Sequence, residues 1–110
     1  MKKLTALFLA LLMLVSMCAC ASPASTEDDA YQAKVALCLV TPVNDGAWSQ
    51  LAYDAVMKAK DTYNISVKYT ENIKPTEMEA VFTNYASQGY DLIIGHSFSF
   101  GDAALAVAER

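Results

Sequence analysis

The most constraining feature of the sequence is a run of six apolar residues at positions 35–40, Val-Ala-Leu-Cys-Leu-Val, with no polar position inside it. A strand with this composition must be buried on both of its faces, and a parallel sheet that carries helices on both sides provides that environment. The segments that follow alternate between helix-like and strand-like patterns. This alternation predicts an α/β fold with a parallel sheet and right-handed crossovers.

Turn residues separate the first run from a predicted helix that begins near residue 48. Its apolar residues recur at spacings of three and four, which places them on one helical face: Trp48, Leu51, Ala52, Ala55, Val56 and Ala59. Asp45 is the expected N-cap, and Asn64 suits the left-handed residue that ends a helix. Residues 65–69 alternate apolar and polar side chains, as a strand does.

A second helix is predicted after Pro75, where Thr76 would act as the cap and Glu79 would complete a capping box. Its apolar face comprises Met78, Val81, Phe82, Tyr85 and Ala86, and Gly89 would follow its end. Residues 91–95 form the third predicted strand, and residues 102–110 begin a third helix.

The expected architecture is a partial doubly wound parallel sheet with the order β-α-β-α-β-α along the chain. The first strand should lie between the second and the third, so that the loops after the first and third strands leave in opposite directions. Ligands bind at such a switch point in doubly wound sheets. Because three strands are few for this architecture, we expect residues 34–110 to be an incomplete N-terminal lobe, with a complete small domain as the alternative.

The N-terminus has the pattern of an export signal over residues 1–19. Two lysines precede an apolar stretch that is at the short end for a membrane span. The stretch ends in a sequence that resembles a bacterial lipobox, which makes Cys20 the expected lipidation site, with Cys18 as the alternative. Ordinary cleavage near Ala21 or Ser25, or an uncleaved anchor helix, would be the simpler outcome. Residues 20–33 are small, polar and acidic, and would form a flexible tether.

The charge balance excludes one class of partner. Beyond residue 19 the chain carries 12 acidic and 6 basic residues, whereas nucleic-acid binding needs a basic surface. The sequence has no phosphate-binding loop, nucleophile elbow or dinucleotide motif, and its Cys and His spacing makes no zinc site. We therefore expect no enzyme activity and no cofactor or metal, and we expect Cys38 to be a buried apolar residue.

The candidate ligand-binding residues lie in the two loops at the predicted switch point. The first loop and the start of its helix contribute Asn44, Asp45, Trp48 and Ser49, and the loop after the third strand contributes His96, Phe98 and Asp102. Simpler roles also fit: a helix cap for Asp45, a core position for Trp48, and a backbone-bonded or solvated loop residue for His96. Asp102 could merely favour the start of a helix. As the sole tryptophan, Trp48 could instead offer a flat face to an aromatic ligand.

Two segments resemble the basic membrane protein family: residues 34–60 (KVALCLVTPVNDGAWSQLAYDAVMKAK) and residues 85–108 (YASQGYDLIIGHSFSFGDAALAVA). Members of this family are substrate-binding lipoproteins of ABC importers with the type I periplasmic-binding-protein fold. The resemblance implies that the chain holds the N-terminal part of lobe 1. It further implies a small-molecule solute, with a purine nucleoside favoured, an ABC permease as partner, and a lipid anchor on the extracytoplasmic face of the cell membrane.

The family motif D-x-[SG]-[FW]-[NS]-Q falls on residues 45–50. By this resemblance Trp48 would stack on the base, and Asp45, Ser49 and Asp102 would bind its polar groups. With one partial lobe, the 110-residue chain should bind nucleosides weakly or not at all. The alternatives are an exported flavodoxin-like enzyme domain and a surface lipoprotein for adhesion or signalling.

Overall fold

The computed structural model describes residues 30–110. The predicted signal peptide, the predicted lipidation site at Cys20 and residues 20–29 of the predicted tether lie outside the described residues. Within residues 30–110, no helix combines the length and the apolar character needed to cross a membrane.

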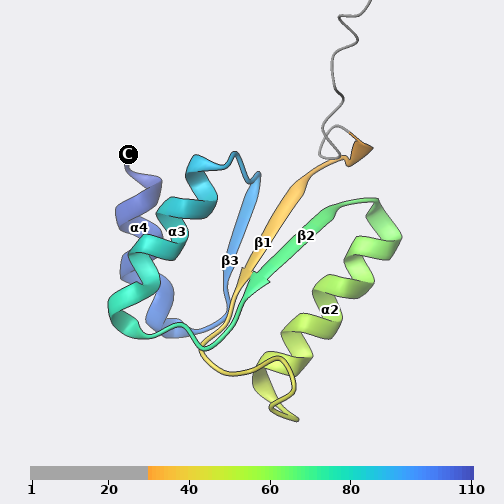
Figure 1. The fold of residues 1–110 in the computed structure, drawn as a ribbon, viewed down its shortest axis with the longest axis horizontal. Helices are drawn as coiled ribbons and strands as arrows, with labels where there is room; N and C mark the ends of the chain where they lie inside the picture. The colour runs from red at the N-terminus through yellow and green to blue at the C-terminus, as the bar shows by residue number, and fades with distance from the viewer. Residues whose placement is uncertain (1–29) are drawn as a thin grey trace, which may run out of the picture.

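In this part of the chain, three parallel strands alternate with three α-helices (Figure 1). The strands are β1 (Lys34–Cys38), β2 (Ser66–Thr70) and β3 (Leu92–Gly95), and the α-helices are α2 (Trp48–Tyr63), α3 (Met78–Ser87) and α4 (Gly101–Ala108). Short 3-10 helices, η2 (Pro75–Glu77) and η3 (Phe98–Phe100), lead into α3 and α4. The spatial order β2-β1-β3, with both pairs parallel, confirms the predicted doubly wound arrangement.

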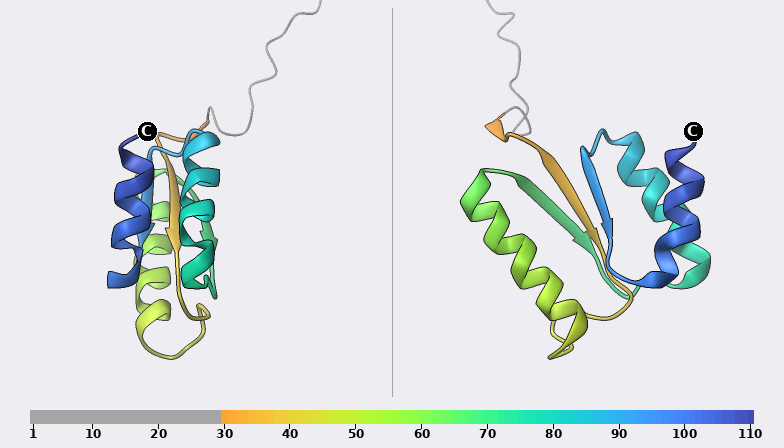
Figure 2. Two further views of the ribbon diagram at one scale, coloured as in Figure 1. Left: turned by 90° about the vertical axis from the view of Figure 1, so that its left-hand side faces the viewer. Right: turned by 180° about the vertical axis from the view of Figure 1, so that it is seen from behind.

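Strand β1 is buried on both faces, as its apolar sequence predicts. Ala36 and Cys38 belong to the core that α3 and α4 complete; its other buried members are Ile73, Met78, Phe82, Tyr85 and Phe100. Val35 and Leu37 alternate to the opposite face of the sheet, which α2 covers. Figure 2 shows α2 on one side of the sheet and α3 and α4 on the other. Right-handed crossovers explain this division, because β2 and β3 lie on opposite sides of β1.

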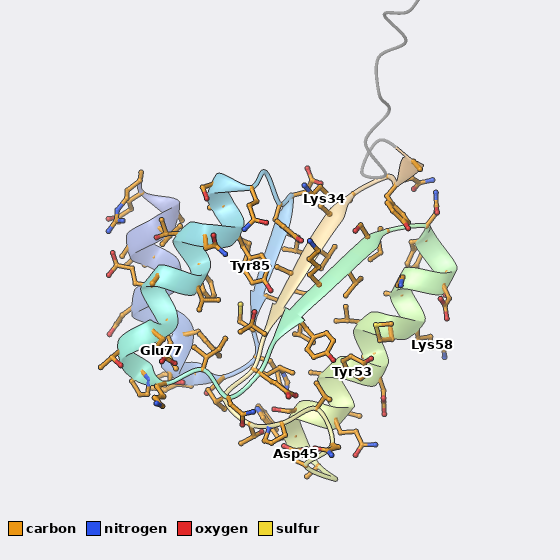
Figure 3. The ribbon with its side chains drawn as sticks, viewed as in Figure 1. Lys34, Asp45, Tyr53, Lys58, Glu77 and Tyr85 are labelled. Atoms are coloured by element: carbon orange, nitrogen blue, oxygen red, sulfur yellow. The ribbon has the colours of Figure 1, made fainter. Side chains whose placement is uncertain are left out.

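The face of α2 that packs against the sheet is rotated by one residue from the predicted face. Trp48, Leu51 and Ala55 belong to the predicted apolar stripe but are exposed. Ala52, Val56 and Ala59 of the predicted stripe are half-buried, and the remaining buried or half-buried positions are Ser49, Tyr53, Met57 and Lys60. Tyr53 packs edge-on against Tyr69 of β2, with ring centroids 5.0 Å apart (Figure 3). Of the two roles considered for Trp48, the core position is therefore wrong, and its indole lies at the surface.

The predicted ends of the helices are confirmed. Asn64 ends α2 in the left-handed conformation, with φ 51° and ψ 51°. Gly89 follows α3 with a φ of 71°, which a glycine adopts without steric cost. The first strand is shorter than predicted, since β1 ends at Cys38 rather than at Val40.

The start of α3 differs from the prediction. The capping interaction joins Lys74 and Glu77, whose Oε2 accepts a hydrogen bond from the Lys74 backbone N–H at 3.0 Å. The predicted pair, Thr76 and Glu79, lies two residues further along the chain. Pro75 explains the shift, because proline fits the first position of a helix and moves the helical start back to residue 75.

The end of β3 depends on the absence of a side chain. The rings of Phe82 and Phe100 stack with centroids 5.7 Å apart, beside Gly95. A β-carbon at Gly95 would lie 2.6 Å from Phe100 Cβ and 2.9 Å from Phe82 Cζ. This close approach lets η3 and the start of α4 pack directly against the end of the strand.

Substituting Gly95→Ala should lower the free energy of unfolding by about 1–3 kcal/mol, the usual effect of overpacking a core. Gly101→Ala is the matched control, since Gly101 has a helical φ of −55° and open space at its β-carbon position. We expect the control to raise the stability by about 0.4–1 kcal/mol. Urea unfolding followed by circular dichroism measures both, and equal effects of the two substitutions would contradict the packing described.

Candidate functional site

The loops after β1 and β3 leave the sheet side by side at its carboxyl-terminal edge. Cys38 and Gly95 are register partners at the ends of the two strands, and the His96 backbone N–H donates to Cys38 O at 2.9 Å. From this edge the chain turns to α2 on one face and to α4 on the other (Figure 1, Figure 2). The predicted switch point is therefore present. Asp45 marks the loop after β1 in Figure 3.

The carboxylate of Asp45 organises the loop after β1. Its Oδ1 accepts hydrogen bonds from the backbone N–H groups of Ala47 (2.9 Å) and Gln50 (3.2 Å). Its Oδ2 accepts from the Thr41 hydroxyl (2.7 Å) and from the Ser49 N–H (3.0 Å). The Thr41 hydroxyl, followed by the N–H groups of Ala47 and Ser49, holds the pKa of Asp45 well below its ordinary value of 3.8.

Ser49 lies beneath this loop and has no exposed surface. Its hydroxyl lies 2.6 Å from the Thr41 hydroxyl, so the two groups share a hydrogen bond. Ala47 occupies the N-cap position of α2, which corrects the predicted N-cap at Asp45. Asp45 nevertheless satisfies N–H groups of the first helical turn from two residues upstream. The polar atoms of Asp45 and Ser49 are therefore engaged with the protein itself and hold the loop in shape.

Trp48 and His96 join the two loops across the switch point. Their rings stack with centroids 4.5 Å apart and planes inclined by 24°. Trp48 Nε1–H donates to the His96 carbonyl oxygen (3.1 Å), and His96 Nε2 lies 3.1 Å from the Trp48 carbonyl oxygen. His96 is half-buried, whereas 57% of the Trp48 surface is exposed. Two residues predicted from different loops are thus brought together, and the imidazole covers one face of the indole.

The other predicted residues lie at the rim of this site or beyond it. Asn44 is exposed in the loop after β1, and Phe98 is fully exposed in η3. Asp102 is exposed in the first turn of α4, where it lines a hollow with Ser99 and with residues of η2 and α3. Trp48 is not part of that hollow. The structure therefore assembles Trp48 with His96 and places Asp102 in a separate depression.

Two residues that support the site were not among those predicted from the sequence. Thr41 bridges Asp45 and Ser49, and Glu71 Oε2 accepts a hydrogen bond from the Val43 N–H (2.9 Å). The second contact ties the loop after β2 to the loop after β1. The spacing of four residues between Thr41, Asp45 and Ser49 is a sequence signal for the first contact. The contact of Glu71 has no local signal, because it joins residues 28 positions apart.

The side chains of this region offer stacking and hydrogen bonding. Among residues 30–110, no group of three or more His, Cys, Asp or Glu side chains is arranged to hold a metal ion. Cys38 is buried in the core, and burial raises the pKa of its thiol to about 11. The thiol is therefore protonated at neutral pH and is a poor nucleophile.

The chain is similar in sequence and in structure to binding proteins of ABC transporters. The sequence profile of the family described as "ABC transporter substrate-binding protein PnrA-like" matches residues 32–110. A relative from Haloferax volcanii, named as an ABC transporter glucose-binding protein (TsgA13), is 36% identical over 72 residues, which make up 64% of this chain and 18% of that protein. A solved structure of an ABC transporter system solute-binding protein from Conexibacter woesei is 31% identical, with a TM-score of 0.66.

The two relatives are much longer than this chain. The match to the Conexibacter woesei protein covers 70% of this chain and 26% of that one. The chain thus spans about a quarter or less of the length of these relatives. The structural likeness confirms the predicted fold class, a partial lobe of the periplasmic-binding-protein type.

Substituting Asp45→Asn should destabilise the protein at neutral pH, because an amide cannot accept all the hydrogen bonds that the carboxylate accepts. The low pKa of Asp45 in the folded state means that its contribution is present above the unfolded value, near 3.8, and is lost as the pH falls toward the folded value. The difference in urea midpoint between wild type and Asp45→Asn should therefore become smaller as the pH falls below about 3.8. Asp54→Asn, the same change in charge at an exposed position of α2, is the control and should stay close to wild type. A difference that persists unchanged in acid would contradict the role of the carboxylate.

Proposed function

The chain belongs to the PnrA-like family of ABC transporter substrate-binding proteins, and we propose that it captures a nucleoside or a related small polar solute for an ABC importer. Members of this family are substrate-binding proteins rather than enzymes. The action of the chain is accordingly reversible binding without covalent chemistry. An exported enzyme domain, the alternative suggested by the fold alone, does not agree with this family.

The exposed indole of Trp48 is the observation that carries the proposal. The ring is 57% exposed at the switch point of the sheet, where ligands bind in this architecture. An indole at such a place is a flat apolar surface on which a purine base can stack. Stacking of a base on an aromatic side chain contributes about 1–3 kcal/mol.

Polar recognition would come from the residues around the indole. Asn44 is exposed on the same loop and can both donate and accept hydrogen bonds. Phe98 offers a second exposed aromatic ring on the loop after β3, whereas Asp102 and Ser99 line a separate hollow and would serve a solute that extends to it. In this proposal Asp45 and Ser49 serve the ligand indirectly, because their polar atoms shape the loop that carries Trp48.

Tight capture would need a second wall for the site. One stacked ring contributes about 1–3 kcal/mol, whereas micromolar affinity corresponds to about 8 kcal/mol. We propose that the remaining contacts come from a second lobe that closes over the solute about a hinge, and that the closed form docks on a membrane permease. The greater length of the relatives supports this arrangement.

The N-terminal segment would hold the protein at the membrane. In this proposal residues 1–19 are removed, Cys20 receives lipid chains, and residues 20–33 tether the domain on the extracytoplasmic face. Two or more acyl chains suffice for stable anchoring.

A sugar is the second candidate for the solute. The relative from Haloferax volcanii is named as a glucose-binding protein, and an aromatic ring can also pack against the apolar face of a hexose. The indole of Trp48 can stack on a nucleoside base or on a sugar ring, and a titration with each solute distinguishes the two candidates.

The purified protein should bind adenosine with a dissociation constant of about 10–200 mM, because one wall of the site supplies only the stack of about 1–3 kcal/mol. The nuclear magnetic resonance signal of the Trp48 indole N–H, which is unique because the chain has one tryptophan, should shift during the titration. Trp48→Ala should abolish adenosine binding, and Trp48→Phe should retain part of it. Tyr63→Ala is the matched control, since Tyr63 is an exposed aromatic residue at the other end of α2.

A parallel titration with glucose distinguishes the candidate solutes. A shift of the indole signal with adenosine but not with glucose supports a nucleoside, and the reverse supports a sugar. Absence of any shift with either solute at tens of millimolar would contradict the proposed function. Micromolar affinity of this chain would contradict the need for a second wall.

Mass spectrometry of the mature protein tests the anchor. Cys20 should be the N-terminal residue, with a diacylglycerol group on its sulfur and an acyl chain on its amino group. A mature N-terminus at Ala21 or Ser25 without lipid, or an intact leader, would contradict lipid anchoring.

A further inference from the structure

His96 and Trp48 are joined by a ring stack and by two hydrogen bonds. Besides the stack at 4.5 Å, each of the two side chains forms a hydrogen bond to the backbone carbonyl of the other residue. Since a carbonyl oxygen can only accept, His96 Nε2 must carry a proton to donate to it. One carbonyl lies in the first turn of α2 and the other follows the end of β3. The paired contacts therefore fix the indole relative to both elements.

This geometry commits one ring face and one ring nitrogen of His96 to Trp48. The indole lies against one face of its imidazole, Nε2 is engaged with Trp48, and the residue is half-buried. The two rings are stacked with centroids 4.5 Å apart, so a flat molecule cannot enter between them without separating them. The indole face opposite His96 is the one left for stacking.

We propose that His96 is a positioning residue of the solute site. It holds the indole of Trp48 in a single orientation, with one face covered by imidazole and the opposite face presented to the solute. The consequence for solute binding rests on the proposed function, whereas the fixed orientation of the indole rests on the geometry alone. The sequence places His96 among the candidate ligand-binding residues. In this proposal it acts on the solute through Trp48 instead.

The physical benefit of the arrangement is preorganisation. An exposed tryptophan without such contacts exchanges between rotamers and loses that freedom when a ligand stacks on it, which weakens binding. A side chain that is already fixed avoids this loss. Removing the imidazole should therefore weaken adenosine binding by about 2- to 10-fold, the effect of immobilising one side chain.

Three substitutions separate the two contacts that the imidazole makes. His96→Ala removes both the stack and the Nε2–H donor, His96→Phe retains a stacking ring, and His96→Gln retains an N–H donor. The bond from Trp48 Nε1–H to the carbonyl of residue 96 is available in all three variants, because its acceptor is backbone. Tyr63→Ala serves again as the control for a general effect on α2.

Two measurements on these variants test the role. The first follows the ligand-free protein by the near-ultraviolet circular dichroism of Trp48 and by its indole N–H resonance, which report the orientation of the one indole in the chain. His96→Ala should lose the dichroism band and shift the resonance, and His96→Phe should restore much of both. The second measures adenosine affinity, which should fall by about 2- to 10-fold in His96→Ala and recover in part in His96→Phe. Far-ultraviolet circular dichroism verifies that each variant is folded.

The outcomes separate the two proposals. An unchanged indole signal in His96→Ala overturns the positioning role, and so does a changed signal with unchanged adenosine affinity. Loss of affinity that neither His96→Phe nor His96→Gln restores would mean that the imidazole contacts the solute directly, which also overturns it. If the wild-type protein binds neither adenosine nor glucose, the proposed function fails, and the ligand-free signal alone decides whether His96 fixes the indole.

Discussion

Burial of β1 on both faces is the constraint on which the arrangement of the other elements depends. Each large apolar side chain that leaves water there contributes about 1.5–3 kcal/mol, so this strand must occupy the centre of the sheet. Its two hydrogen-bonding edges are taken by β2 and β3, and its two faces are covered by α2 on one side and by α3 and α4 on the other. The loop after β1 must then leave toward α2, whereas the loop after β3 leaves toward α4. The candidate site lies between these two loops, which leave adjacent strands toward opposite faces of the sheet.

The elements and their order could be predicted from the sequence because both follow from local patterns and from handedness. A fully apolar run requires a doubly covered strand, and the alternation that follows it leaves few topologies. The rotation of α2 could not be predicted in the same way, since hydrophobic periodicity treats Ser49 as a surface residue. Its hydroxyl is buried and shares a hydrogen bond with the Thr41 hydroxyl. With Ser49 on the buried face of α2, the neighbouring Trp48 lies at the surface. A proline likewise displaced the start of α3, which a capping motif alone does not reveal.

The same reasoning applies to the candidate site. The sequence located the two loops correctly, because their position follows from the strand order. It could not assign the roles within them, since these depend on which side chains are already engaged with other groups of the protein. Asp45 is surrounded by donors from its own loop, and His96 is paired with a residue 48 positions away. Polar residues thus hold the framework, and the indole of Trp48 is left 57% exposed at the switch point. That division suits a site in which a rigid flat surface receives the solute.

The buried thiol of Cys38 has a consequence for the dynamics of the sheet. The residue is the last of β1 and has no exposed surface, so an alkylating reagent can reach it only when the strand separates from its neighbours or from the helices above it. Its rate of alkylation would therefore count openings of the central strand, which belong to the rarest motions of a small domain. Amide exchange at the loops would register far more frequent fluctuations. The alkylation rate of the Cys38 thiol thus reports the slowest opening motions of the sheet.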